Sequence, residues 1–211
     1  MLKPLLVRGA ALALICLALG ACSHSKPQIK PVDELLAQGE QAWQRKKWGQ
    51  AAQHYGQVRD YYPYHTQATL AQFRAAEALY NDEEYVQALA AFENFQELHP
   101  LDQRLPLVLL RIGQCHFHLS ASIDRDQTET EEAVKAFKQV QKRFSKSPQA
   151  EEAEKLLRLA YIKLVRHELY VARFYRKTKA YQASIGRYEK ALSYPEVGFG
   201  PRIEAELAQV K

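Results

Sequence analysis

The sequence predicts an all-α protein, built as a solenoid of about nine stacked helices. From Val32 onward, apolar residues recur at the spacing of one helix face, as at Leu157, Ala160 and Leu164. No stretch alternates apolar and polar residues with an enrichment of β-branched side chains, so no sheet is expected. The 211 residues contain only 9 Gly and 9 Pro, which is few for a protein rich in turns or strands.

A recurring pattern of small and aromatic residues predicts how these helices pair. The first two units share four positions 37 residues apart: Trp48, Ala51, Tyr55 and Pro63, then Tyr85, Ala88, Phe92 and Pro100. Two later units follow the pattern less regularly: Ala133, Phe137 and Val140, then Tyr181, Ser184, Ile185, Tyr188 and Ala191. Small residues let two helices approach closely, an aromatic ring fills the space beside them, and Pro ends the second helix because it has no N–H to donate. The pattern resembles the tetratricopeptide repeat, which predicts a right-handed solenoid of four repeats and a partial C-terminal helix over residues 32–211.

Two departures from the regular period are expected in the later repeats. The segment from Ser120 to Thr130 is polar and reads as an insertion between two helices. A long helix is expected to begin at Ser147-Pro148, because Ser caps helix N-termini and Pro suits the first helical position, and to run to about Lys177. A last helix is expected from Ile203 to Val210.

Residues 1–21 have the organisation of a lipoprotein signal peptide. Lys3 and Arg8 form a short positive region before an apolar run over residues 10–19, which is too short for a transmembrane helix of roughly 20 apolar residues. The run ends in Leu19-Gly20-Ala21-Cys22, which resembles the bacterial lipobox, where small residues admit the chain to a peptidase and the Cys thiol takes the lipid. The alternative is an ordinary signal peptide with a chance cysteine. Residues 22–31 then form a lipidated tether, because two prolines and no apolar period favour an extended chain.

Cysteine usage agrees with a lipid anchor at Cys22. Cys16 lies in the segment to be removed and only Cys115 remains elsewhere, so no internal disulfide is expected in the mature chain. Several acyl chains on one cysteine, palmitate among them, anchor a protein durably to a membrane. Ser23, rather than Asp, follows Cys22, which favours the outer membrane where the enteric sorting rule applies.

Charge and motifs exclude several classes of function. The net charge falls from +5 to +3 when Lys3 and Arg8 leave with residues 1–21, which contain no acid, and this is too mild to predict nucleic-acid binding. No nucleophile elbow, dinucleotide fingerprint or zinc-protease motif is present, so neither an enzyme activity nor a cofactor is predicted. Cys115, His116 and His118 suggest a metal site, but such a site needs three or four ligands. The favoured interpretation is a small buried cysteine beside partly exposed histidines, and no metal.

The inner helices of the first two repeats are expected to line a peptide-binding groove. By repeat position, the side chains that point into the groove are Leu36, Glu40, Trp43, Phe73, Glu77 and Tyr80. Aromatic rings above acidic rims suit an extended or helical peptide with an aromatic anchor. The alternative for Trp43 and Phe73 is packing between repeats, since an aromatic residue at helical spacing is most often part of a core.

Several segments are more specific than a generic repeat. They are Asp124 to Thr128, Arg143-Phe144 with Ser147-Pro148, His167 to Tyr175, and Tyr181 to Tyr188 with Arg187 before the aromatic. Together with the lipobox and the two earlier repeats, they resemble the BamD family, the tetratricopeptide lipoproteins of the outer-membrane β-barrel assembly machinery, over nearly the whole chain. The family usually has a fifth repeat, of which this chain has only the start of the first helix.

The resemblance implies a scaffold anchored in the inner leaflet of the outer membrane and facing the periplasm. Its C-terminal half would contact the POTRA domains of a BamA-like barrel subunit, and its N-terminal repeats would be available to unfolded outer-membrane proteins or accessory assembly lipoproteins. The expected partner contacts are Tyr170, Arg173, Arg176 and Arg187. The alternative for Arg187 is a solvated side chain, or an ion pair with Glu168 or Glu189.

A different repeat lipoprotein is the alternative function. It would be a pilotin that delivers secretin subunits, or a cell-wall-linked competence or division factor. The segments at 124–128 and 167–175 separate the two hypotheses, because generic repeat lipoproteins would not share them.

Overall fold

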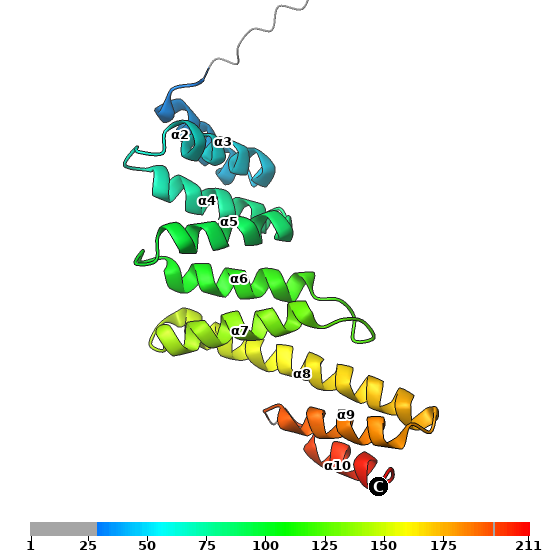
Figure 1. Ribbon diagram of the computed structural model, residues 1–211. Coiled ribbons are helices and arrows are strands. Elements are labelled where there is room, and N and C mark those ends of the chain that lie inside the picture. Colours follow the sequence, from blue (N-terminus) through cyan, green and yellow to red (C-terminus); the bar gives the residue numbers. More distant parts are fainter. Residues whose placement is uncertain (1–28, 196) are drawn as a thin grey trace, which may run out of the picture. The chain divides into compact units, whose positions relative to one another are not determined.

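The computed structural model describes residues 29–195 and 197–211, and its helices belong to one compact unit, Val32–Lys211 (Figure 1). These described residues form nine α-helices and no strand, which confirms the predicted all-α class. The predicted signal peptide, Cys22 and most of the tether lie outside the described residues. None of the helices in the described ranges is both long and apolar enough to cross a bilayer.

The helices stack in the order in which they follow one another along the chain. Their bounds are α2 (Val32–Gln44), α3 (Trp48–Tyr61), α4 (Ala68–Asn81), α5 (Tyr85–Leu98), α6 (Leu105–Leu119), α7 (Thr128–Arg143), α8 (Pro148–Lys177), α9 (Tyr181–Ser193) and α10 (Gly200–Ala208). Each helix packs mainly on its neighbours in sequence, and α6 also contacts α8 (Figure 1). The pairs α2/α3, α4/α5, α6/α7 and α8/α9 therefore form a tetratricopeptide-type array, with α10 packed on α9.

The small and aromatic positions of the repeat pack as the sequence indicates. Glycine is required at two of the close approaches, because a Cβ on Gly39 would lie 2.9 Å from the Tyr55 ring, and one on Gly113 would lie 2.5 Å from the Phe137 ring. Both rings are buried, so neither has room to move away. Helix packing in the first and third pairs thus depends on a glycine opposite an aromatic ring.

Three tight turns share one backbone conformation. Lys46, Glu83 and Lys179 have φ values of 54°, 61° and 60°, and each lies two residues before the aromatic residue that begins α3, α5 or α9. The left-handed region is uncommon for residues other than Gly. Its recurrence at one repeat position shows that the geometry of the helix pair imposes it. The third pair has the polar loop of residues 120–127 instead, closed by the Gln127 side chain, which donates to the Ser122 carbonyl at 2.8 Å.

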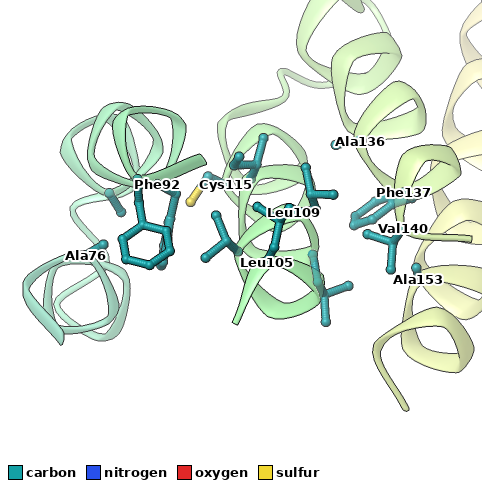
Figure 2. Close-up of a cluster of buried hydrophobic side chains, with 14 of the residues drawn as sticks. Ala76, Phe92, Leu105, Leu109, Cys115, Ala136, Phe137, Val140 and Ala153 are labelled. Carbon is teal, nitrogen blue, oxygen red and sulfur yellow. The ribbon is translucent and has the colours of Figure 1, made fainter. Parts of the chain in front are cut away.

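The largest core lies between α4 and α8 (Figure 2). Helix α6 is at its centre, and its Leu105 and Leu109 are buried together with Phe92 of α5 and Phe137 of α7. Burying each side chain of this size contributes about 1.5–3 kcal/mol. Cys115 lies on the side of α6 nearer Phe92 and is fully buried, so it is a packing residue.

Helix α8 has the predicted start and end. Ser147 caps it, accepting a hydrogen bond from the Ala150 N–H at 3.3 Å, and Pro148 occupies the first helical position. Its 30 residues span roughly 45 Å at 1.5 Å per residue. The helix supplies three separate clusters of buried side chains: Ala150 and Ala153, then Ala160, Tyr161 and Leu164, then Val165, Leu169 and Ala172.

The last helix begins earlier than the sequence pattern indicates. The expected range was Ile203 to Val210, whereas α10 covers Gly200–Ala208. Pro201 lies in its first turn, where a missing N–H costs no hydrogen bond, so the helix can start before the first periodic apolar residue.

Candidate binding surfaces

The first expected groove position is occupied by contacts within the chain. The Trp43 ring lies under the guanidinium of Arg74, with 4.6 Å from Cζ to the ring centroid, and meets the edge of Trp48. Glu40 accepts hydrogen bonds from Gln44 at 2.7 Å and from the Tyr55 hydroxyl at 3.0 Å, and these bonds hold its pKa below the usual value. Glu40 is exposed, and Trp43 is half-buried.

In the second repeat, the expected groove residues Glu77 and Tyr80 are covered more fully by the neighbouring repeat. Arg111 of α6 donates to both carboxylate oxygens of Glu77, from Nε at 2.8 Å and from Nη2 at 3.3 Å. The same guanidinium lies 4.3 Å from the Tyr80 ring centroid. Glu77 and Phe73 are buried, and Phe73 belongs to the core of Figure 2. The Phe73 ring and the Glu77 carboxylate are therefore not available to a partner, because neighbouring repeats cover them.

These contacts form a ladder that repeats along the inner helices. Aromatic residues 37 positions apart each lie under a cation supplied by the next inner helix: Trp43 under Arg74, Tyr80 under Arg111 and Phe117 under Lys163. We call these three pairs the cation–aromatic ladder. The last cation is held by Ser120, whose backbone carbonyl accepts from Lys163 Nζ at 3.0 Å. The sequence pattern did not lead us to expect these cations, although Arg74 and Arg111 are themselves 37 residues apart.

A groove of about 800 Å³ lies on another side of the first two repeats, bounded by α3, α4 and α5. Small side chains such as Ala52, Gly56 and Ala91 leave it open, and the amides of Gln53 and Asn94 line it. It contains no residue of the expected peptide groove.

In the C-terminal half, Arg187 takes part in a buried charge cluster. Glu168 of α8 is only 1% exposed, and its two carboxylate oxygens accept from Arg187 Nη1 at 2.9 Å and from Lys190 Nζ at 2.7 Å. The hydrogen bond with Glu168 raises the pKa of Lys190. Arg187 therefore forms the ion pair that was the alternative in the sequence interpretation, yet 37% of its side chain remains exposed.

Tyr170 and Arg173 lie at a different place, which we call the basic–aromatic pocket. It has a volume of about 480 Å³, lies between α8 and α10, and is closed on one side by Ile123 of the polar loop. Its cations are Arg166, Arg173, Lys177 and Arg202, and its aromatic residues are Tyr170, Phe174 and Phe199. Arg173 forms a two-point ion pair with Glu206 of α10, at 2.8 and 2.6 Å.

The four expected partner contacts therefore do not form one patch. At about 100° per residue, Tyr170 lies about 160° around α8 from Glu168, the residue that holds Arg187. Arg176 contacts Gln209 of the C-terminal segment at 3.3 Å and does not line the pocket. The C-terminal half thus presents one charged site beside α9 and another pocket across α8.

The residues considered as metal ligands are used in packing. Burial raises the pKa of the Cys115 thiol to about 12, so it stays protonated. His118 stacks on Tyr85 with 4.2 Å between ring centroids, and His116 contacts Glu129 at 2.7 Å. Within residues 29–195 and 197–211, no group of three or more His, Cys, Asp or Glu residues is placed to hold a metal ion.

The paired helices and their nearest-neighbour packing define a tetratricopeptide-type solenoid. Its surface carries partly exposed charged groups. Residues 28–199 match the family model YfiO, described as outer membrane lipoprotein, and the chain belongs to this family. The resemblance to the BamD family is thereby confirmed.

Curated relatives carry the name outer membrane protein assembly factor BamD. The protein of Pasteurella multocida is 32% identical over 199 residues, covering 88% of this chain and 76% of its own length. That of Neisseria gonorrhoeae is 29% identical over 205 residues, covering 91% and 77%. That of Caulobacter vibrioides is 24% identical over 194 residues, covering 90% and 64%. Among solved structures, the TPR2AB domain of yeast Sti1 in a pHSP90 complex aligns with 76% of each chain at a TM-score of 0.45 and 14% identity, too distant a likeness to support an inference.

Proposed function

We propose that this protein is a lipid-anchored scaffold for outer-membrane protein assembly, which binds a POTRA-containing barrel subunit through its C-terminal half. Family membership supports the assembly role, because the relatives carry the name of an assembly factor. The observation that supports the proposed contact with the barrel subunit is the cluster at Glu168, a buried carboxylate that pairs with Arg187 and Lys190 of α9.

The cluster has the chemistry of a docking point for a carboxylate. A guanidinium has five N–H donors, and Arg187 uses one of them on Glu168, so the others remain for a partner. Because Glu168 already orders the side chain, less conformational entropy is lost when a partner binds. Lys190 adds a second cation to the same point, and Arg is favoured at interfaces for its two-point bonds to carboxylates.

The inner face of the first two repeats is the proposed surface for unfolded outer-membrane proteins and accessory lipoproteins. The groups that remain accessible there are exposed Glu40 and half-buried Leu36, Trp43 and Tyr80. The contact would use these side chains and the outward side of the ladder cations, rather than Phe73 or Glu77.

Lipidation at Cys22 would place the scaffold in the inner leaflet of the outer membrane, facing the periplasm. The support is the Leu19-Gly20-Ala21-Cys22 motif and the family description as outer membrane lipoproteins. Cys22→Ala should abolish acylation and leave unprocessed precursor or soluble protein, as measured by intact mass and membrane fractionation. Unchanged processing and partitioning would contradict the anchor.

Copurification with the barrel subunit tests the interface. Arg187→Glu is a poor choice, because it would put a second carboxylate against buried Glu168. Arg187→Gln leaves Lys190 to neutralise Glu168, so the fold should persist while copurification falls about tenfold, roughly the effect of losing one well-placed charged contact. Lys155→Gln is the matched control, since Lys155 is an exposed cation on α8 away from the cluster.

The thermal midpoint of each variant separates loss of contact from loss of fold. Undiminished copurification of Arg187→Gln at near-physiological salt would remove this residue from the interface. An equal loss in Lys155→Gln would show that general surface charge, and not the cluster, supports the contact.

A further inference from the structure

We infer that the basic–aromatic pocket between α8 and α10 is a second binding site, for an acidic polypeptide segment in which carboxylates neighbour an aromatic side chain. The pocket lies across α8 from Arg187, so it is distinct from the proposed contact with the barrel subunit.

The pocket carries more positive charge than its own acids neutralise. Glu206 is the carboxylate that engages its cations, pairing with Arg173 at 2.6 Å and with Arg202 at 3.1 Å. In the part of the chain that the structure describes, Arg166 and Lys177 form no ion pair with a carboxylate. Two cations are therefore left to attract an anion.

Two acids on the neighbouring loop, Asp124 and Asp126, are engaged within that loop. The Asp124 carboxylate accepts a hydrogen bond from the Ser122 hydroxyl, and Asp126 accepts from the Thr128 N–H at 2.9 Å, so both serve the turns of the loop itself. Neither aspartate lines the pocket. The positive end of the α10 helix dipole lies at the pocket wall, where Phe199 is the N-cap residue, and it also favours an anion.

Two of the three aromatic side chains of the pocket are largely uncovered. Tyr170 is 49% exposed and Phe174 is 57% exposed, so both rings can be reached by a ligand in the pocket. Arg166 lies 5.9 Å from the Phe199 ring centroid, so a cation and a ring are presented together. A volume of about 480 Å³ is within the range of ligand pockets and is enough for a few side chains.

The walls of the pocket are held in place before any ligand arrives. His167 Nδ1 donates to the Ile123 carbonyl at 2.8 Å, which fixes the loop against α8. The Glu206 carboxylate ties α10 to α8 through Arg173 and to α9 through the Tyr188 hydroxyl, at 3.0 Å. A preformed site of this kind loses little conformational entropy on binding.

Carboxylates beside an aromatic ring are the chemistry that this arrangement recognises. Carboxylates fit guanidinium groups in a planar, two-point geometry, and a ring can pack against Tyr170 and Phe174 while it faces the cations. A basic segment would be repelled by the uncompensated cations.

The test is fluorescence anisotropy with the mature lipoprotein in detergent. The probe is a fluorescein-labelled peptide of alternating Asp and Phe flanked by Gly and Ser, and the comparison peptide has Lys in place of Asp. The Arg166→Gln, Lys177→Gln double variant should weaken binding of the acidic probe about tenfold, and Tyr170→Ala about fivefold, as expected for lost charged and aromatic contacts. The lysine peptide should not bind.

The matched control is the Lys155→Gln, Arg158→Gln double variant, which removes two exposed cations from α8 outside the pocket. It should bind the probe within about twofold of the unaltered protein, as expected for distant rim charges. Equal weakening in the control, or unchanged binding in the pocket variants, would overturn the inference.

Cosedimentation of the soluble, non-acylated Cys22→Ala protein with phosphatidylglycerol vesicles distinguishes a lipid ligand, because without the acyl anchor vesicle binding must come from the protein surface. If the pocket variants lose vesicle binding but keep peptide binding, the polypeptide assignment is wrong. Copurification with the barrel subunit should be unchanged in the pocket variants, so failure of this inference and failure of the proposed contact at Arg187 give different results.

Discussion

The inner helices of the two halves carry the same kinds of residue but use them differently. In the first three repeats, each aromatic residue of the ladder is covered by a cation from the next inner helix. In the basic–aromatic pocket, Tyr170 and Phe174 are about half exposed while the cations lie beside them. Composition alone therefore does not tell whether an aromatic residue is a binding anchor. Whether the ring is covered depends on the side chains that the next helix supplies.

The difference arises from the helix that follows. Helices α4, α6 and α8 each place a cation over an aromatic ring of the preceding inner helix. Helix α10 has nine residues, and its Glu206 draws Arg173 and Arg202 towards itself. Both arginines therefore pair with a carboxylate, and Tyr170 stays about half exposed.

The largest expected effect is the loss of the closed ion pair in the N-terminal half. Glu77→Ala should lower the free energy of unfolding by about 3 kcal/mol, because it leaves the mostly buried Arg111 guanidinium without its carboxylate. Urea denaturation measures this loss. Glu40→Ala is the control at the equivalent repeat position, and because Glu40 is exposed it should cost less than about 1 kcal/mol. Equal losses in the two variants would mean that burying the carboxylate against Arg111 of the next repeat adds no stability.

Truncating one tyrosine in each half compares the rings directly. Tyr80→Ala should destabilise the protein by about 2 kcal/mol, because the ring packs under Arg111 and against Tyr85. Tyr170→Ala should cost less than about 0.5 kcal/mol, since half of that side chain is already in solvent. Thermal unfolding of the two variants measures both losses of stability. A larger loss in Tyr170→Ala than in Tyr80→Ala would contradict the comparison.

A pH dependence should mark the attachment of α10. Hydrogen bonds from Arg173, opposed in part by burial, and further bonds from Arg202 and Tyr188 lower the pKa of Glu206 from 4.5 to about 2. Because the pKa in the folded state is the lower one, the stabilisation is complete above pH 4.5 and is lost as the pH falls towards about 2.

Hydrogen exchange of α10 amides between pH 5 and pH 3 measures this dependence. Protection should fall with pH in the unaltered protein, beyond the intrinsic change in exchange rate. In Glu206→Gln it should already be low at pH 5 and change little. A Glu206→Gln profile identical to that of the unaltered protein would show that this carboxylate does not hold α10.

The smallest expected effect concerns the positive-φ residues of the tight turns, where the same substitution should change the stability of both halves equally. Lys46→Gly and Lys179→Gly should each raise the free energy of unfolding by about 0.5 kcal/mol, because Gly adopts positive φ without the steric cost that Lys bears, offset in part by its greater freedom in the unfolded chain. Lys47→Gly is the control, because Lys47 has a φ of −87° and gains nothing from the exchange. A loss of stability at either Lys46 or Lys179 would contradict the account of these turns.

Local signals predicted much of the fold. The apolar periodicity indicated the helices, and Ser147-Pro148 located the start of α8 because cap and proline chemistry act within a few residues. The contacts of the ladder depend on which helix follows in space. Arg74 and Arg111 could have been found from their 37-residue spacing, but Lys163 lies 52 residues after Arg111 because of the insertion and long helix between them.

The basic–aromatic pocket could not be predicted from patterns within one helix, because its residues come from distant segments of the chain. Tyr170 and Arg173 were chosen from the resemblance, but Ile123 and Arg202 reach them from segments more than 28 residues away. Their meeting depends on where the polar loop folds and on how α10 docks. Neither event has a signal within one helix, and the same holds for the pairing of Arg187 with Glu168 across two helices.

The length of α8 also governs how the array can come apart. In a repeat array, neighbours are coupled only through their interfaces, so an end repeat can open alone. One unbroken helix here supplies three clusters of buried side chains, and its melting from the C-terminal end would expose Leu169, then Leu164, before reaching a repeat boundary. The segment from α7 to α10 should therefore open as one cooperative unit, while α2 and α3 fray independently. A partner that pulled on the C-terminal end would therefore have to disrupt several clusters of buried side chains at once.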